Sequence, residues 1–475
     1  MAGHDIDTKG LAQQRMAAAW ELISDLRGGT RAMRRAGTKW LPQEPREDHL
    51  AYQARLNRTY LYGAMSDTIK KLSAKPFSKP VVVKQGDTLP DQLAAIQKNA
   101  NLGGKDLTQF CRSIFEDGVA WGLGHILVDF PATEGAITTL AEERASGVRP
   151  YFVRISPRNI IGAESSVQLD GSLRVTRLRY FEDGVDTEDN AEKPRRDIRV
   201  ITPDAWELWQ QKGDSKKYVL AKSGRHTFGR VPLVTFYTGQ VGAMEAEPPL
   251  EDLAWLNLAH WQSMSDQRNI LRFARVGILF GSGFTEEEYE NGITIGPSNL
   301  VISTDPQADL KYVEHSGKAI GAGKEDLEAL EARMEVLGLQ PLMKATGGET
   351  ATARAMGEAR THSSVQAWIT SLANAMEEAY GMAAEWVKVA LPDDFAVDIF
   401  NDFGVMLTAD ADHKTLLDMK ARNLITHRTY LAEVKRRGLL ADEVNVDAEI
   451  DAVGKEEADE LDRVGGQPDQ DQDQE

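Results

Sequence analysis

The sequence predicts a mostly helical α+β protein. Apolar residues recur at helical spacing over roughly the first 75 residues and again from about residue 249 onward. Between them, from about residue 148 to 240, apolar and polar residues alternate and turn residues break the runs, which is typical of strands. The longest apolar segments hold about ten residues, well short of the roughly 20 that a membrane-spanning helix needs, so we expect no membrane contact.

Charge and cysteine content narrow the function classes. The chain has 475 residues, with 55 Lys and Arg against 73 Asp and Glu, which gives a formal net charge of −18. This acidity argues against a simple nucleic-acid binder, whose footprint is usually a basic domain. The lone Cys111 excludes an intramolecular disulfide and leaves a cysteine-based zinc site or Fe–S cluster without partners. The polar N-terminus has no apolar stretch after a basic start, so we expect no signal peptide and a protein made in the cytoplasm.

The N-terminal region reads as helices. One helix should span Leu11 to Arg27 and end at Gly28-Gly29. A second should begin near Asp48 and run to Leu72 on an apolar stripe. Its exposed positions include four basic residues: Arg55, Arg58, Lys70 and Lys71. Three further elements should follow: a strand at Val81–Val83, a helix over Leu107–Gly122 and a strand at His125–Phe130.

The alternating block that follows should hold antiparallel strands. Its predicted strands are Tyr151–Ile155, Leu173–Phe181, Ile198–Ile201, Trp206–Trp209 and Tyr218–Leu220. Turn residues such as Gly171-Ser172 and Asp183-Gly184 separate them, and the block closes at Gly229–Val234.

A long helix is predicted after Pro248-Pro249, because proline suits a first helical turn and acidic residues suit the positive end of the dipole. It should continue to Arg275, about 26 residues or about 39 Å. Three arginines lie near its negative end: Arg268, Arg272 and Arg275.

The segment after this helix is compact and returns to a second helix. A strand at Gly277–Phe280, an acidic helical turn at Thr285–Tyr289 and two strands near Leu300 and Leu310 are expected before an acidic helix over Lys324–Leu337. A Gly/Thr-rich break at Lys344–Thr350 then precedes the longest predicted helix, from about Thr352 to Leu391. The remaining elements are a strand at Phe395–Phe400, short helices between Ala409 and Asp462, and an acidic tail typical of disorder from Gly465.

No motif assembles a catalytic site, so we expect no enzyme activity and no cofactor. Gly321-Ala322-Gly323-Lys324 lacks the earlier glycine and the following Ser or Thr of a phosphate-binding loop. Capping and dipole effects explain the acidic pairs at helix starts. The acidic groups Glu286–Glu288 and Asp410/Asp412 could hold a divalent cation, but a solvated acidic surface is the better explanation of them.

The order of elements and several short phrases resemble the portal proteins of tailed double-stranded DNA bacteriophages. The resemblance covers about residues 12–455. The phrases that carry it are Trp40–Pro42, Tyr52–Thr59, Pro76–Pro80, Pro248–Asn257 with Ser265-Asp266, and Asn423–Thr429 with Arg437–Leu440. No single phrase is diagnostic, and their order is the specific signal.

The resemblance implies the portal architecture of wing, stem, clip and crown. The implied regions are a wing over 1–248, a first stem helix over 249–275, a clip over 276–320, a second stem helix over 321–338, a tunnel loop over 339–352, a long wing helix and strand over 353–404, a crown over 405–464 and a disordered acidic tail over 465–475. It also implies a ring of twelve subunits at one capsid vertex of the virion. Such a ring passes double-stranded DNA without sequence specificity and meets the terminase large subunit, a head–tail connector and the major capsid protein.

The resemblance also implies which residues meet these partners. The tunnel loop would place Lys344, Thr346, Gly347, Gly348 and Thr350 near the DNA, because a loop against moving DNA should be flexible, small and weakly charged. The clip would present Glu286, Glu287, Glu288, Tyr289 and Asn291 to terminase and then to the connector. Arg268, Arg272 and Arg275 would contact DNA or a neighbouring subunit, although their place at a helix C-terminus is a sufficient structural explanation.

Two other readings stay open. Another capsid or connector component would have a similar composition, and ring symmetry with an axial channel would separate it from a portal. A metal-dependent nuclease would use the acidic groups, and DNA cleavage lost on changing Glu286 or Asp412 would favour it.

Overall fold

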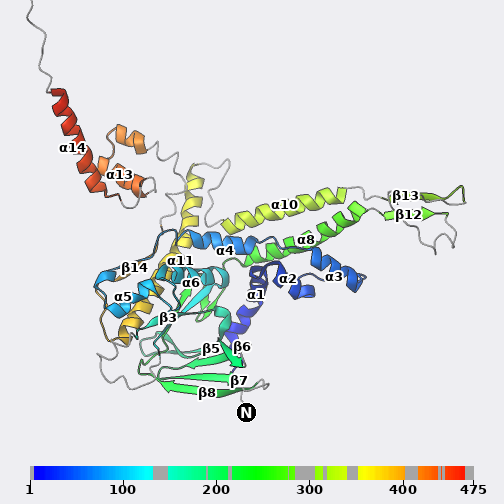
Figure 1. The fold of residues 1–475 in the computed structure, drawn as a ribbon, viewed down its shortest axis with the longest axis horizontal. Helices are drawn as coiled ribbons and strands as arrows, with labels where there is room; N and C mark the ends of the chain where they lie inside the picture. The colour runs from blue at the N-terminus through cyan, green and yellow to red at the C-terminus, as the bar shows by residue number, and fades with distance from the viewer. Residues whose placement is uncertain are drawn as a thin grey trace, which may run out of the picture. The chain divides into compact units, whose positions relative to one another are not determined.

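The structure is a computed structural model, and it divides into two compact units that are described separately. It describes residues 5–131, 148–188, 191–211, 217–276, 278–283, 305–313, 318–339, 351–401, 416–436, 440 and 444–465. The first unit comprises Met1–Met343 and Ser363–Phe400, and the second comprises Lys344–His362 and Asn401–Glu475. Helices and strands are both present, as the α+β prediction requires (Figure 1).

Four helices open the first unit: α1 (Leu11–Arg27), α2 (Gly29–Ala36), α3 (His49–Arg58) and α4 (Ala64–Ala74). The predicted bounds of the first helix are confirmed. The prediction of one helix from Asp48 to Leu72 is wrong, because the chain leaves the helical conformation between α3 and α4. Thr59 is extended there, with φ −72° and ψ 138°.

Side chains of other elements stabilise the non-helical segment between α3 and α4. The guanidinium of Arg34 donates two hydrogen bonds to the carbonyl of Thr59, at 3.1 and 2.8 Å. Asn257 donates to the carbonyl of Tyr62 at 2.9 Å and accepts from the amide of Met65 at 3.2 Å. These partners satisfy backbone groups that would otherwise bond within a helix, so tertiary contacts override the helical pattern.

Arg55 corrects a second expectation. It was expected at the surface, yet only 4% of it is exposed. Its guanidinium donates to both carboxylate oxygens of Glu47, at 2.8 and 2.7 Å, and to the hydroxyl of Ser265 at 3.2 Å. A buried arginine is tolerated because its donors are paired in this way.

Two antiparallel sheets form the β-rich part of the first unit. The three-stranded sheet has the order β3 (Tyr151–Ile155), β2 (Leu123–Asp129), β9 (Leu233–Tyr237). The five-stranded sheet is a meander of β4 (Ile160–Val167), β5 (Leu173–Glu188), β6 (Ala191–Ile201), β7 (Ala205–Gln211) and β8 (Tyr218–Arg225). The alternating sequence pattern therefore predicted the antiparallel strands of this block but missed β4. The turn predicted at Asp183-Gly184 is wrong, because β5 continues through these residues and pairs them with Arg196 and Arg195 of β6.

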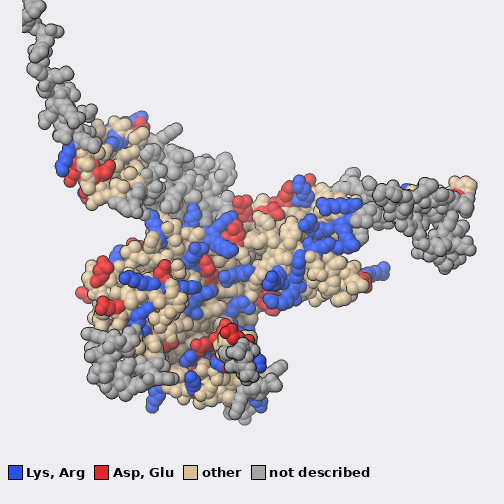
Figure 2. Space-filling view, viewed as in Figure 1, with Lys and Arg blue, Asp and Glu red and all other residues tan. Residues whose placement is uncertain are grey.

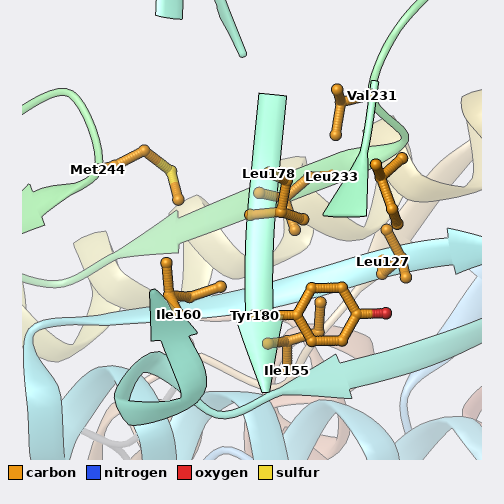
Figure 3. Packing of buried hydrophobic residues seen from close by; sticks show 9 residues of the cluster. Leu127, Ile155, Ile160, Leu178, Tyr180, Val231, Leu233 and Met244 are labelled. Atoms are coloured by element: carbon orange, nitrogen blue, oxygen red, sulfur yellow. The ribbon is translucent and has the colours of Figure 1, made fainter. Parts of the chain in front are cut away.

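A hydrophobic core joins the two sheets. Figure 3 shows Leu127 and Ile155 from the three-stranded sheet facing Ile160, Leu178 and Tyr180 from the meander. Val231, Leu233 and Met244 complete the side chains labelled there. α6 (Leu107–Trp121) packs on β2 and ends at Gly122, whose φ is +88°. A Cβ at Gly122 would lie 2.5 Å from the carbonyl oxygen of Glu247, so both conformation and space require glycine.

Short elements complete this unit. They are α5 (Asp91–Lys98), the 3₁₀ turns η1 (Gly37–Lys39), η2 (Gly86–Thr88) and η3 (Pro157–Asn159), the strand pair β10 (Gln240–Gly242) and β11 (Glu245–Ala246), and β1 (Val82–Lys84) paired with β14 (Ala396–Asp398). The β1–β14 pair joins segments more than 300 residues apart, with Val82 opposite Asp398.

The longest helix, α11 (Ala351–Trp386), ends earlier than predicted. The expected end was Leu391, before Pro392, but Lys388 takes a left-handed conformation with φ +56°. The amide of Val389 donates to the carbonyl of Ala384 at 3.0 Å, which is the hydrogen bond of a Schellman C-cap. The ring of Trp386 stacks on Phe228 at 4.9 Å, which fixes the end of the helix against the core.

The second unit contains the C-terminal helices α13 (His427–Arg436) and α14 (Val446–Gly465). They contact one another, and Arg428 pairs with Asp447 at 3.0 Å. Short helices were predicted in this region. The tail beyond Gly465 lies outside the described residues.

Candidate interaction surface on the α8–α10 helical pair

The predicted stem helices form a pair that packs side by side. α8 (Glu251–Val276) has 26 residues and begins two residues later than the predicted range 249–275. α10 (Lys318–Leu339) has 22 residues and includes the whole predicted range 321–338. Figure 1 shows them side by side, with the antiparallel strands β12 (Ile278–Ser282) and β13 (Asp309–Val313) between them in the chain. The strand predicted near Leu300 and the helical turn at Thr285–Tyr289 lie outside the described residues.

Polar contacts along the pair fix its register. The carboxylate of Asp326 accepts a hydrogen bond from the hydroxyl of Ser263 at 2.7 Å. Gln267 donates to the carbonyl of Ile320 at 3.0 Å. Nε2 of His260 on α8 lies 3.1 Å from a carboxylate oxygen of Glu331 on α10. The contacting positions on α8 ascend while those on α10 descend, so the helices are antiparallel.

Small residues let α10 approach its neighbours closely. A Cβ at Gly338 would lie 2.5 Å from the hydroxyl of Thr68 on α4 and 3.4 Å from Leu253 on α8. A Cβ at Gly323 would lie 2.2 Å from the amide oxygen of Gln267. Both glycines are therefore part of the packing, and neither needs a phosphate ligand to explain it.

The other side of α8 is buried against the N-terminal helices. Trp261 is fully buried, and Asn257 holds the α3–α4 break. Leu253 and Met264 are also buried, and Arg55 of α3 reaches Ser265. α8 therefore packs among four other helices of the first unit: α1, α3, α4 and α10.

A basic group lies where α3 ends beside the C-terminal half of α8. The predicted residues Arg268, Arg272 and Arg275 are all exposed and form no ion pair with any described residue. The guanidinium of Arg268 lies 5.0 Å above the ring of Tyr60. Arg58 donates to the side-chain oxygen of Asn269 at 3.2 Å.

Arg58 also belongs to this basic group, although the sequence predicted it only as an exposed basic position on the second helix. Burial lowers the pKa of Arg58, and the nearby charge of Arg272 lowers it further, so the two arginines lie close enough to repel. Figure 2 shows Lys and Arg gathered over this part of α3 and α8 in a chain that is acidic overall. The helical spacing of the predicted second helix indicated that Arg58 is exposed, but it did not indicate that α8 is its neighbour.

The remaining predicted site residues lie outside the part of the chain that the structure describes. Lys344, Thr346, Gly347, Gly348 and Thr350 lie outside the described residues, as do Glu286, Glu287, Glu288, Tyr289 and Asn291. The acidic residues Asp410 and Asp412 also lie outside them. Within the described part of the chain, no group of three or more His, Cys, Asp or Glu is arranged to hold a metal ion. No described helix is long and apolar enough to cross a membrane.

Comparison with known proteins gives a family model of undetermined function and distant structural neighbours. The model "Domain of unknown function (DUF4055)" matches residues 249–387, which span α8, the β12–β13 strands, α10 and α11. No curated protein matches the chain.

Three solved structures are similar to the chain at 10% identity. A chain from the virion of a native gene transfer agent (GTA) particle has a TM-score of 0.44, with 79% of this chain and 91% of that chain covered. A chain from the neck of an empty GTA particle, computed with C6 symmetry, also has a TM-score of 0.44, covering 78% and 89%. A chain from the neck of a native GTA particle, computed with C12 symmetry, has a TM-score of 0.40, covering 77% and 88%.

Proposed function

We propose that this chain is a portal protein of a tailed phage or phage-like particle. Copies of it form a ring at a unique capsid vertex, and double-stranded DNA passes through the central channel during packaging and ejection. The role is structural rather than catalytic. The partners are the terminase large subunit during packaging, a head–tail connector afterwards, and the major capsid protein around the ring.

The observation that carries this proposal is the antiparallel α8–α10 pair with the β12–β13 strands at its far end. At 1.5 Å per residue, the 26 residues of α8 extend about 39 Å and the 22 of α10 about 33 Å. Repeated around a ring, such pairs give a helical wall of roughly that depth. The strands that join the helices then lie together at one end of the channel, where a docking partner can reach them.

The remaining regions take their roles from their place in the chain. Residues 276–320 form the clip that meets terminase and then the connector, and 339–352 form the tunnel loop between α10 and α11. Residues 405–464 form the crown, which includes α13 and α14. The two sheets and the N-terminal helices form the wing.

The net charge suits a conduit. If twelve copies assemble, 12 × −18 gives a formal charge of −216 for the ring. Salt screens exposed charges beyond about 8 Å at physiological ionic strength, so only residues at the wall act on the DNA. A mostly acidic wall with few basic groups lets the duplex slide, whereas many phosphate contacts would bind it through counterion release.

The mass of the purified protein in solution tests the proposal. Twelve chains of 52.5 kDa weigh about 630 kDa, so light scattering or mass photometry should find a species near that mass. Only monomer at high protein concentration would contradict the proposal. A ring that negative-stain images show to be closed at its axis would indicate another structural component instead.

A further inference from the structure

The exposed surface of α8 is divided into two flanks with opposite charge. Successive residues on a helix are 100° apart, so Asp252, Trp255, Ala259 and Asp266 lie along one side, and each of them is exposed. Asp266 also lies 4.0 Å from the guanidinium of Arg55 on α3. Arg268 follows Asp266 by two residues, which places it about 200° away around the helix. Arg272 and Arg275 continue that second side. We call the first side the acidic flank and the second, together with Arg58, the basic flank.

The acidic flank also carries exposed apolar surface. Trp255 is 52% exposed, and Val336 of α10 is 54% exposed. A groove of about 350 Å³ runs between the helices, lined by Leu256 of α8, the residue after Trp255, with Ala332, Arg333, Val336 and Leu337 of α10. Asp326 lies on the same side of the pair, because it accepts a hydrogen bond from Ser263, which follows Ala259 by one helical turn.

The basic flank is open to a partner of negative charge. The guanidinium of Arg268 lies over the face of the Tyr60 ring. No described carboxylate forms an ion pair with Arg268, Arg272 or Arg275. Like charges would oppose pairing of two basic flanks or of two acidic flanks, which excludes a two-fold contact through either one. A basic flank against an acidic flank pairs opposite charges, and a contact between different surfaces of identical chains is the kind that closes into a ring.

We propose that the partner of the acidic flank is the basic flank of a second copy of this chain. The contact is head-to-tail: Arg272 and Arg275 of one copy lie against Asp252, Asp266 and Asp326 of the next. Trp255 and the groove lined by Leu256 and Val336 are buried in this contact. An aromatic side chain covered in this way is the usual source of most of the binding energy, while the surrounding charges set orientation. This inference rests on the proposed ring, for which it names the surface that joins the subunits.

Charge reversal with a mixing step tests this contact. The first variant, Arg272→Glu with Arg275→Glu, carries acidic residues on both flanks. The second, Asp252→Lys with Asp266→Lys, carries basic residues on both. Each alone should assemble at least about ten-fold more weakly than the wild type, because every contact then joins like charges. Mixed in equal amounts, the two variants should form rings of alternating subunits, since every contact joins opposite charges again.

Two single changes complete the design. Trp255→Ala removes the central side chain from an exposed position, so the fold should be kept while the assembly midpoint shifts to higher concentration. Arg225→Glu is the matched control, because Arg225 lies on β8 with 85% of its side chain exposed and away from both flanks. It should assemble like the wild type. Thermal unfolding of each variant checks that the subunit is intact.

The outcomes separate this inference from the proposed function. Wild-type rings together with reversed variants that assemble equally well would contradict the head-to-tail contact and leave the proposed function standing. Rings from each reversed variant alone, but none from their mixture, would also contradict it. Wild-type protein that forms no ring would contradict the proposed function itself.

Discussion

His260 of α8 and Glu331 of α10 lie 3.1 Å apart, from the imidazole Nε2 to a carboxylate oxygen. His260 is fully buried, and its second ring nitrogen has no hydrogen-bond partner. The ring of Tyr62 lies 5.1 Å from the imidazole. Glu331 therefore provides the only hydrogen bond of the His260 side chain among the described residues, and it joins the two helices of the pair.

Glu331→Ala should destabilise the subunit by about 1–3 kcal/mol, because it leaves a buried polar ring without its partner. The measurement is denaturant unfolding followed by circular dichroism. Glu328→Ala is the control, since Glu328 is on the same helix, is exposed and pairs with Lys324 alone among the described residues. That change should alter the free energy of unfolding by less than about 0.5 kcal/mol. Equal effects of the two substitutions would show that the His260 contact does not stabilise the pair.

Two glycines of α10 should respond in opposite directions to the same substitution. Gly338→Ala puts a Cβ 2.5 Å from the Thr68 hydroxyl, so overpacking should cost about 1–3 kcal/mol. Gly321→Ala meets nothing within 4 Å and gains helix propensity, so it should stabilise by up to about 1 kcal/mol. Thermal unfolding of both proteins measures the difference. Stabilisation by Gly338→Ala would mean that α10 does not pack closely against α4.

The sequence predicted the elements that depend on local pattern and missed those that depend on distant contacts. The bounds of α1 and β3 were predicted to the residue, because helical or alternating spacing and turn residues suffice to define them. The α3–α4 break could not be predicted from periodicity. Its causes are Arg34 and Asn257, and Asn257 is nearly 200 residues away in the chain.

The candidate surface shows the same division. Helix-end position was enough to single out Arg268, Arg272 and Arg275, but Arg58 joins them only because α3 packs against α8. Arg55, three residues earlier on the same helix, is buried in an ion pair with Glu47 instead. Sequence spacing gives the face of a helix, whereas the neighbour that covers this face is set by tertiary packing.

The buried His125 should make stability depend on pH. Only 2% of this residue is exposed, its Nδ1 lies 3.1 Å from the hydroxyl of Thr235, and burial lowers its pKa to about 3. Since the pKa in the unfolded chain is about 6.5, the unfolded state binds a proton first as the pH falls. The stabilisation is complete above pH 6.5 and decreases below it, by up to about 1.4 kcal/mol per pH unit.

Unfolding temperatures between pH 7.5 and 5 test this dependence. His125→Gln removes the titrating group, so the advantage of the wild type over the variant should shrink as the pH falls. His49→Gln is the control, because His49 is exposed on α3. A difference between wild type and His125→Gln that stays constant over this range would contradict the role of His125.

The Gly/Thr-rich segment Lys344–Thr350 gives a prediction about DNA rather than stability. Under the portal proposal, Lys344→Ala combined with deletion of Gly347 and Gly348 should impair DNA packaging or retention and leave ring assembly intact, because these residues follow α10 in the sequence and belong to neither helix of the α8–α10 pair. Genome content of particles built with the variant is the measurement, and the mass of the isolated ring is the control. Particles of the variant that contain a normal amount of DNA would contradict the proposal that these residues act on DNA in the channel.

The most direct test of the portal proposal is an electron-microscopy reconstruction of the purified full-length protein viewed down its symmetry axis. We predict a closed ring of repeated subunits around an open channel, with the α8–α10 pair of each subunit in its wall. Monomers, or rings whose channel wall is formed by other elements, would contradict the account.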